Sequence, residues 1–130
     1  MSKGFENAFR NLQSKLQSFQ KDSLTVIQVM SERHYRDSFR DGGFTNDSLQ
    51  RWKPLKNRQA NPLVKTGQLR GSVRSQIIGN SVHVLSDLPY AGYQNYGTKY
   101  IPQRQFIGLS KKLNRDIKNR IMGLAKKIFY

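Results

Sequence analysis

The chain has 130 residues, no cysteine and a formal net charge of +15 at pH 7. Its length predicts a single domain, residues 1–130, around one hydrophobic core, and the lack of cysteine excludes disulfides and thiolate metal sites. Residues 51–130 carry sixteen Lys and Arg against two Asp and Glu, so this part attracts polyanions such as nucleic acid, an acidic membrane surface or an acidic protein.

The first predicted element is helical and covers residues 3–38. Five apolar residues are spaced four, three, four and three apart, which puts them on one helical face: Phe5, Phe9, Leu12, Leu16 and Phe19. Because Asp22-Ser23 offers an N-cap, the segment is either one long helix or two. Gly42 and Gly43 are poor helix residues and are expected to end it.

Residues 41–65 show no sustained periodicity and contain Gly, Asn, Asp and two prolines. We therefore expect a long loop there, ordered or partly mobile. Trp52 and Leu55 are the residues expected to anchor it to the core.

The strongest β signal lies near residues 72–86. Two short runs with alternating or β-branched residues flank Gly79-Asn80, a dipeptide that suits a two-residue hairpin turn. Val73 and Ile77 are expected on one face of the hairpin, with Val82 and Val84 opposite them across the turn.

The remaining elements are a short helix over residues 89–97, a strand over 99–107 and a C-terminal helix over 110–128. Pro89 suits the first turn of the short helix and Gly97 its end, and Pro102 favours extended backbone before it. The last helix has an apolar stripe from Leu113 to Ile128. This order of elements, with a small antiparallel sheet built on the hairpin, predicts an α+β fold.

Neither a leader nor a membrane span is visible in the sequence. The first residues lack the apolar run of a secretory signal, and no stretch is long enough to cross a bilayer. We expect a protein that is made in a cytosol, has no membrane partner, and leaves only as part of a larger particle.

No enzymatic chemistry can be assigned to particular residues. His34 and His83 lie in separate elements, and only Asp47, Asp87 and Asp116 are acidic beyond residue 41. Paired carboxylates or a Mg²⁺ site would need acidic residues to converge. We therefore expect no catalytic residue, no metal and no cofactor.

Basic residues gather in the long loop and on the C-terminal helix. They form either a solvated surface or a contact with an acidic protein or with DNA, and DNA binding would be independent of sequence because no base-reading motif is visible. The candidates are Arg51, Lys53, Lys56, Arg58, Lys111, Lys112, Arg115 and Lys118.

Tyrosines gather in the run LPYAGYQNYGTKY, residues 88–100. Tyr90, Tyr93 and Tyr96 are three apart and share one side of the short helix. Three hydroxyl groups are awkward to satisfy in a small core, whereas protein interfaces are apolar at the centre and wet at the rim. These tyrosines are thus expected at an interface, or divided between interface and core.

Four sequence blocks, taken in order, resemble the phage virion morphogenesis and tail completion family. This family comprises small tail-to-head joining and neck proteins of tailed bacteriophages. The resemblance covers about residues 39–110, and the order of four blocks is more specific than any one block. The matching residues are Trp52, Pro54 and Leu55; Leu63, Thr66, Gly67, Leu69 and Ser72; Tyr90, Ala91, Gln94 and Gly97; and Pro102, Arg104, Phe106 and Gly108.

Two of the blocks depart from the family pattern. The family commonly has a histidine where this chain has Tyr93, and prolines flank the arginine where this chain has Gln103 and Gln105. The backbone pattern of both blocks is nevertheless kept.

The resemblance implies a non-enzymatic structural protein that acts late in assembly, in the tail or neck of a virion assembled in the bacterial cytoplasm. It implies a ring of identical subunits joined by heterologous contacts, with a tail tube or tail terminator protein and a head-completion or neck protein as partners. DNA would pass through the channel. The alternative is a nucleic-acid-binding protein without sequence specificity.

Site roles follow from the same resemblance. Interface candidates are Tyr90, Tyr93, Gln94, Tyr96 and Arg104. Structural anchors are Trp52, Leu55, Gly67, Leu69, Gly97 and Phe106.

Overall fold

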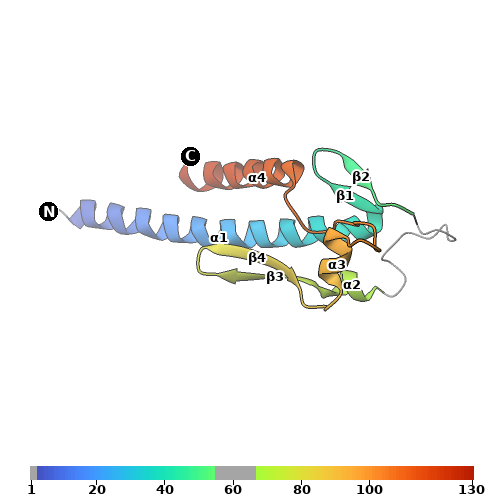
Figure 1. Cartoon of the computed structure of the whole chain (residues 1–130). Coiled ribbons are helices and arrows are strands. Elements are labelled where there is room, and N and C mark those ends of the chain that lie inside the picture. Colours follow the sequence, from blue (N-terminus) through green and yellow to red (C-terminus); the bar gives the residue numbers. More distant parts are fainter. Residues whose placement is uncertain (1–2, 55–66) are drawn as a thin grey trace.

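The computed structural model describes residues 3–54 and 67–130. One long helix is the spine of the molecule, with a second helix along one side of it and a β-hairpin along another (Figure 1). The elements in chain order are α1 (Lys3–Asp41), β1 (Gly43–Thr45), β2 (Leu49–Arg51), α2 (Gln68–Ser72), β3 (Val73–Ile78), β4 (Ser81–Ser86), α3 (Ala91–Tyr96) and α4 (Lys111–Phe129). The expected α+β class is confirmed.

Helix α1 runs unbroken through Asp22-Ser23, so one helix forms rather than two. It ends where Gly42 takes a positive φ of 70° and its N–H donates to the Ser38 carbonyl at 2.9 Å. A residue without Cβ adopts this conformation at little cost, which explains the stop.

Helix α4 packs antiparallel on α1. Leu113, near its start, lies beside Met30 and His34, whereas Phe129, at its end, meets Phe19 edge-on with 5.6 Å between ring centroids. The N-cap is Ser110, whose side chain accepts from the Leu113 N–H at 3.1 Å. The helix boundaries agree with the apolar stripe predicted from the sequence.

The hairpin β3–β4 has the predicted two-residue turn. Ile78 pairs with Ser81, and Gly79 has a φ of 60°, as this kind of tight turn requires. Ile77 lies opposite Val82, as expected. A polar side chain of α1 holds the hairpin, since the Arg36 guanidinium donates two hydrogen bonds to the Val73 carbonyl, at 2.7 and 3.1 Å.

A second, shorter hairpin corrects the prediction of a loop over residues 41–65. Strands β1 and β2 pair Gly43 with Arg51 and Thr45 with Leu49. A Cβ at Gly43 would collide with the Gln50 backbone, so the pairing requires glycine there. Strands of three residues are too short to show a period in the sequence. The rest of the predicted loop, 55–65, lies outside the described residues, and so does the anchor Leu55.

The turn of this hairpin is attached to the start of α4. Asn46 accepts the Lys111 N–H on its side chain at 2.8 Å and the Lys112 N–H on its carbonyl at 3.0 Å. Ser110 donates its hydroxyl to the Thr45 carbonyl at 2.7 Å. These bonds satisfy N–H groups that a helix start leaves open, so contacts distant in sequence stabilise the short strands.

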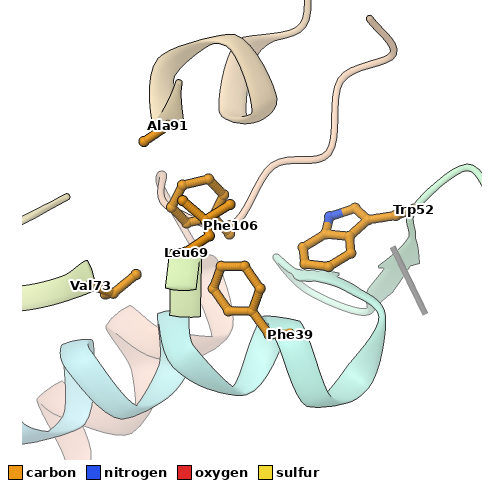
Figure 2. Close-up of a cluster of buried hydrophobic side chains, with 6 residues drawn as sticks. All are labelled: Phe39, Trp52, Leu69, Val73, Ala91 and Phe106. Carbon is orange, nitrogen blue, oxygen red and sulfur yellow. The ribbon is translucent and has the colours of Figure 1, made fainter. Parts of the chain in front are cut away.

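The core lies at the end of the molecule where α1 terminates. Six buried residues form it, each from a different part of the chain: Phe39, Trp52, Leu69, Val73, Ala91 and Phe106 (Figure 2). The Phe39 ring lies 5.2 Å from Phe106 and 5.6 Å from Trp52, centroid to centroid. Trp52 also donates its indole N–H to the Gln105 carbonyl at 2.7 Å, so the buried polar group is satisfied.

No strand forms over residues 99–107, which corrects that prediction. The segment lies against α3 and is held by individual hydrogen bonds rather than by a ladder. The side-chain oxygen of buried Asn95 accepts both the Phe106 N–H at 2.9 Å and the Ile107 N–H at 3.0 Å. The Asn95 side-chain amide thus accepts the hydrogen bonds that a neighbouring strand would otherwise accept, and it positions Phe106 in the core.

None of the helices in residues 3–54 and 67–130 is long and apolar enough to cross a membrane.

Half-buried His34 links α1 to the first hairpin, since its Nε2 lies 3.0 Å from the Thr45 carbonyl oxygen. Burial lowers the pKa of His34 below the ordinary 6.5, against the effect of the Thr45 hydrogen bond. Because the folded pKa lies below the unfolded one, the unfolded chain binds more protons between the two values. Protonation of His34 therefore opposes folding.

We predict that the free energy of unfolding falls as the pH drops from above 6.5 through the lower folded pKa of His34. His34→Gln keeps a side-chain N–H for Thr45 but does not titrate. The free energy of unfolding of this variant should therefore fall less over the same pH range. Urea unfolding at several pH values measures both. Parallel pH profiles for the two proteins would contradict the role given to His34.

Candidate interaction surfaces

Helix α3 has a buried side and an exposed side. Ala91 and Asn95, four residues apart, face inward at 7% and 5% exposure. Tyr93 and Tyr96 point outward at 59% and 75% exposure, and Tyr100 in the following turn is 86% exposed. We refer to Tyr93, Tyr96 and Tyr100 as the tyrosine surface. Two of its rings, Tyr93 and Tyr96, lie on the short helix α3, whose buried side carries Asn95.

Contacts made by Tyr90, Gln94 and Gly97 hold this helix in place. Tyr90 is 37% exposed and donates its hydroxyl to the Gln68 side chain at 3.1 Å, so it is partly a surface residue and partly a link to α2. Gln94 is half-buried, and its carbonyl accepts the Arg104 N–H at 2.8 Å. Gly97, with a φ of 77°, ends α3 in close contact with the Gln103 backbone.

The structure places Arg104 in the interior rather than on the surface. Its exposure is 7%, and its Nε donates to the Lys53 carbonyl at 3.0 Å. The side chain thereby joins the segment before α4 to the chain that follows β2. The sequence predicted a strand over residues 99–107 with Arg104 at an interface, but the chain is irregular there and turns this arginine inward. We therefore exclude Arg104 from the candidate surface.

Most of the predicted basic contacts on α4 are paired with carboxylates. Asp47 lies 2.7 Å from Arg115 and 3.7 Å from Lys111, and Lys112 lies 2.7 Å from Asp116. The hydrogen bond from Arg115 is the main reason why the pKa of Asp47 lies below its usual value. The pairs of Asp47 attach the short hairpin to α4, the Lys112–Asp116 pair lies within α4, and all of them reduce the charge available to a polyanion.

The other basic candidates have different surroundings. Arg51 and Lys53 are exposed at and after β2, whereas Lys56 and Arg58 lie outside the described residues. Lys118 is exposed on α4. Within the described part of the chain it has no ion pair, and the same holds for three further residues of that helix: Arg120, Lys126 and Lys127.

A second exposed apolar surface lies on α1. Every residue from 3 to 18 is exposed, and we call this segment the α1 arm. It extends past the ends of α4 and of the β3–β4 hairpin (Figure 1). Three large apolar residues with three–four spacing, Phe9, Leu12 and Leu16, are 52%, 47% and 51% exposed. The spacing of apolar residues predicted this stripe, but helical spacing does not show whether another element covers an apolar stripe.

The structural role of Asn95 was not predicted from the sequence. An asparagine between two tyrosines in a polar run carries no signal of burial. Its importance depends on two N–H groups more than ten residues away, which only the fold brings to it.

The chain is similar to part of a phage protein. It is 37% identical over 73 residues to "Mu-like prophage FluMu G protein 2" of Haemophilus influenzae. The matched segment covers 51% of this chain and 53% of the relative. The chain thus spans about half the length of this curated relative. No protein-family model matches the chain, and no solved structure matches it. The similarity supports a phage origin.

We predict effects of different size on the free energy of unfolding for two substitutions near α3. Arg104→Ala removes the buried guanidinium that donates to the Lys53 carbonyl and should lower the free energy of unfolding by about 1.5–3 kcal/mol. Tyr96→Ala removes an exposed ring and should change it by less than about 0.5 kcal/mol. Chemical denaturation of both variants measures this. Equal stabilities would contradict the interior position of Arg104.

Proposed function

We propose that this protein is a non-enzymatic structural protein of a tailed bacteriophage, which completes the tail or joins tail to head as a ring of subunits. The observation that carries the proposal is the 37% identity, over half the chain, to the Mu-like prophage protein. The four ordered blocks that resemble the virion morphogenesis and tail completion family support the finer assignment.

The positions of the block residues agree with such a role. Trp52, Leu69, Ala91 and Phe106, one from each block, meet in the core. The blocks therefore specify a scaffold, and the scaffold holds the tyrosine surface outward. Aromatic residues on a rigid support provide large contact area at little entropic cost, as protein interfaces require.

In the assembled particle, the tyrosine surface is the proposed contact. It meets either the next subunit of the ring or the adjacent tail tube, terminator or neck protein. Tyr93 and Tyr96 lie on one short helix, so both rings reach the same partner. The excess of positive charge in residues 51–130 faces DNA in the channel or an acidic neighbouring ring.

We predict that phage carrying Tyr93→Ala and Tyr96→Ala together fail to complete their particles. Electron microscopy should show separate heads and tails, or tails of abnormal length, as it should for phage that lack the protein. Tyr130→Ala is the matched control, because this C-terminal ring is 96% exposed and lies outside the tyrosine surface.

Two results would contradict the proposal at different levels. Normal infectious particles without the protein would exclude a role in assembly. If the double tyrosine variant gives normal particles while phage that lack the protein do not, only the role of the tyrosine surface as the contact would be excluded.

A second candidate function is nucleic-acid binding without sequence specificity. The observation that favours it is the group of exposed α4 cations without an ion pair in the described residues: Lys118, Arg120, Lys126 and Lys127. Charges that no carboxylate neutralises are the ones that displace counterions from DNA.

For this candidate we predict binding to duplex DNA that weakens steeply with added salt, because bound phosphates release counterions. Lys118→Gln combined with Lys126→Gln should reduce the salt dependence. Fluorescence anisotropy with labelled DNA at two salt concentrations measures both effects. No binding at low salt would exclude the candidate.

A further inference from the structure

The α1 arm continues the face of α1 that α4 covers. Phe19, Val26 and Met30 lie on the α4 side of α1, by ring contact with Phe129 and by lining grooves with α4 residues. Phe9, Leu12 and Leu16 precede Phe19 at the four–three spacing of a coiled-coil seam. We call these three residues the exposed seam. Within the described residues, the cover of this face ends with α4.

Both elements that flank α1 end at the same level. Phe129, the last residue of α4, reaches Phe19, and Asn80 in the β3–β4 turn accepts a hydrogen bond from Gln20 at 2.5 Å. The arm of sixteen residues, 3–18, therefore extends about 24 Å beyond the body at 1.5 Å per residue. Helices of this length are marginal in water without a packed apolar face.

From this continuity we propose that the exposed seam is covered by the same seam of a second copy, with the two arms antiparallel. Antiparallel arms of equal length overlap fully, and each tip arrives where the α4 helix of the other copy ends. The partner's arm then covers the apolar face of the arm, just as α4 covers the same face along the rest of α1. Such a contact is self-complementary and closes at two copies.

A parallel pair is excluded by α4. Two parallel helices that share this seam would continue side by side past residue 19. There the partner's α1 would occupy the place in which α4 already contacts Phe19 and Val26. Only the antiparallel arrangement leaves both bodies outside the contact.

The charge distribution favours the arm over other surfaces for contact between identical chains. Residues 3–18 carry three basic residues and one acidic residue, a net +2, against +13 for the rest of the chain. Like charges repel when copies of a basic protein meet. Arm-to-arm contact keeps the strongly basic parts of the two bodies apart.

Sedimentation of the whole protein over a range of concentrations tests the proposal. We expect a monomer–dimer equilibrium. Leu12→Gln with Leu16→Gln should raise the dissociation constant by at least about tenfold for each substitution, since each removes an apolar contact without adding charge or lowering helix propensity. Ser14→Gln with Ser18→Gln is the matched control, with the same spacing off the seam, and should dimerise like the parent.

A dimer that persists in the Leu12→Gln, Leu16→Gln variant, or a parent that stays monomeric at all concentrations, would overturn the proposal. Orientation is tested by cysteine exchange, because the chain has no cysteine. Phe5→Cys mixed with Leu16→Cys should form a disulfide between the two variants under oxidation, because fully overlapping antiparallel arms place residue 5 opposite residue 16. Disulfides of Phe5→Cys with itself would indicate parallel arms and contradict the arrangement. These outcomes are independent of the proposed role in assembly.

Discussion

The packing of α4 and the β3–β4 hairpin against one stretch of α1 stabilises the long helix and fixes the positions of the elements around it. A helix of 39 residues does not fold by propensity alone; its packed face stabilises it. Here the packed stretch begins near Phe19 and Gln20 and runs to the core around Phe39. The two flanking elements have unlike contacts with α1: α4 is apolar, whereas the hairpin is held by polar side chains such as Arg36.

Where the backbone is irregular, single polar side chains take the place of regular pairing. Asn95 bonds two N–H groups of the segment before α4, and Trp52 and Arg104 bond two carbonyls. Each of these side chains is buried, so each unmade bond would leave a polar group without water or partner. They position the chain beneath α3 and so determine how the tyrosine surface is presented.

Periodic patterns in the sequence predicted the periodic elements. The stripes of α1 and α4 and the Gly79-Asn80 turn of β3–β4 lie where the residues indicated, since each signal is local. The β1–β2 hairpin could not be predicted, because its three-residue strands depend on bonds to Ser110 and Lys111, about 65 positions away. Arg104 was misplaced for a similar reason: its burial depends on the Lys53 carbonyl, not on its neighbours.

Two surfaces remain on this scaffold, the tyrosine surface beside the core and the exposed seam on the arm. They lie toward opposite ends of the molecule (Figure 1), so a contact at one leaves the other accessible. A pair of copies joined by their arms would thus still present both tyrosine surfaces to a growing particle. This accessibility follows from the division of α1 into a packed stretch and a free arm.

Amide hydrogen exchange along α1, at low and at high protein concentration, tests that division most directly. Amides of residues 23–41 should be protected at both concentrations, because they share the stability of the body. Amides of residues 5–18 should exchange quickly in dilute protein and gain protection as the concentration rises. Equal protection of the two stretches in dilute protein would contradict the account.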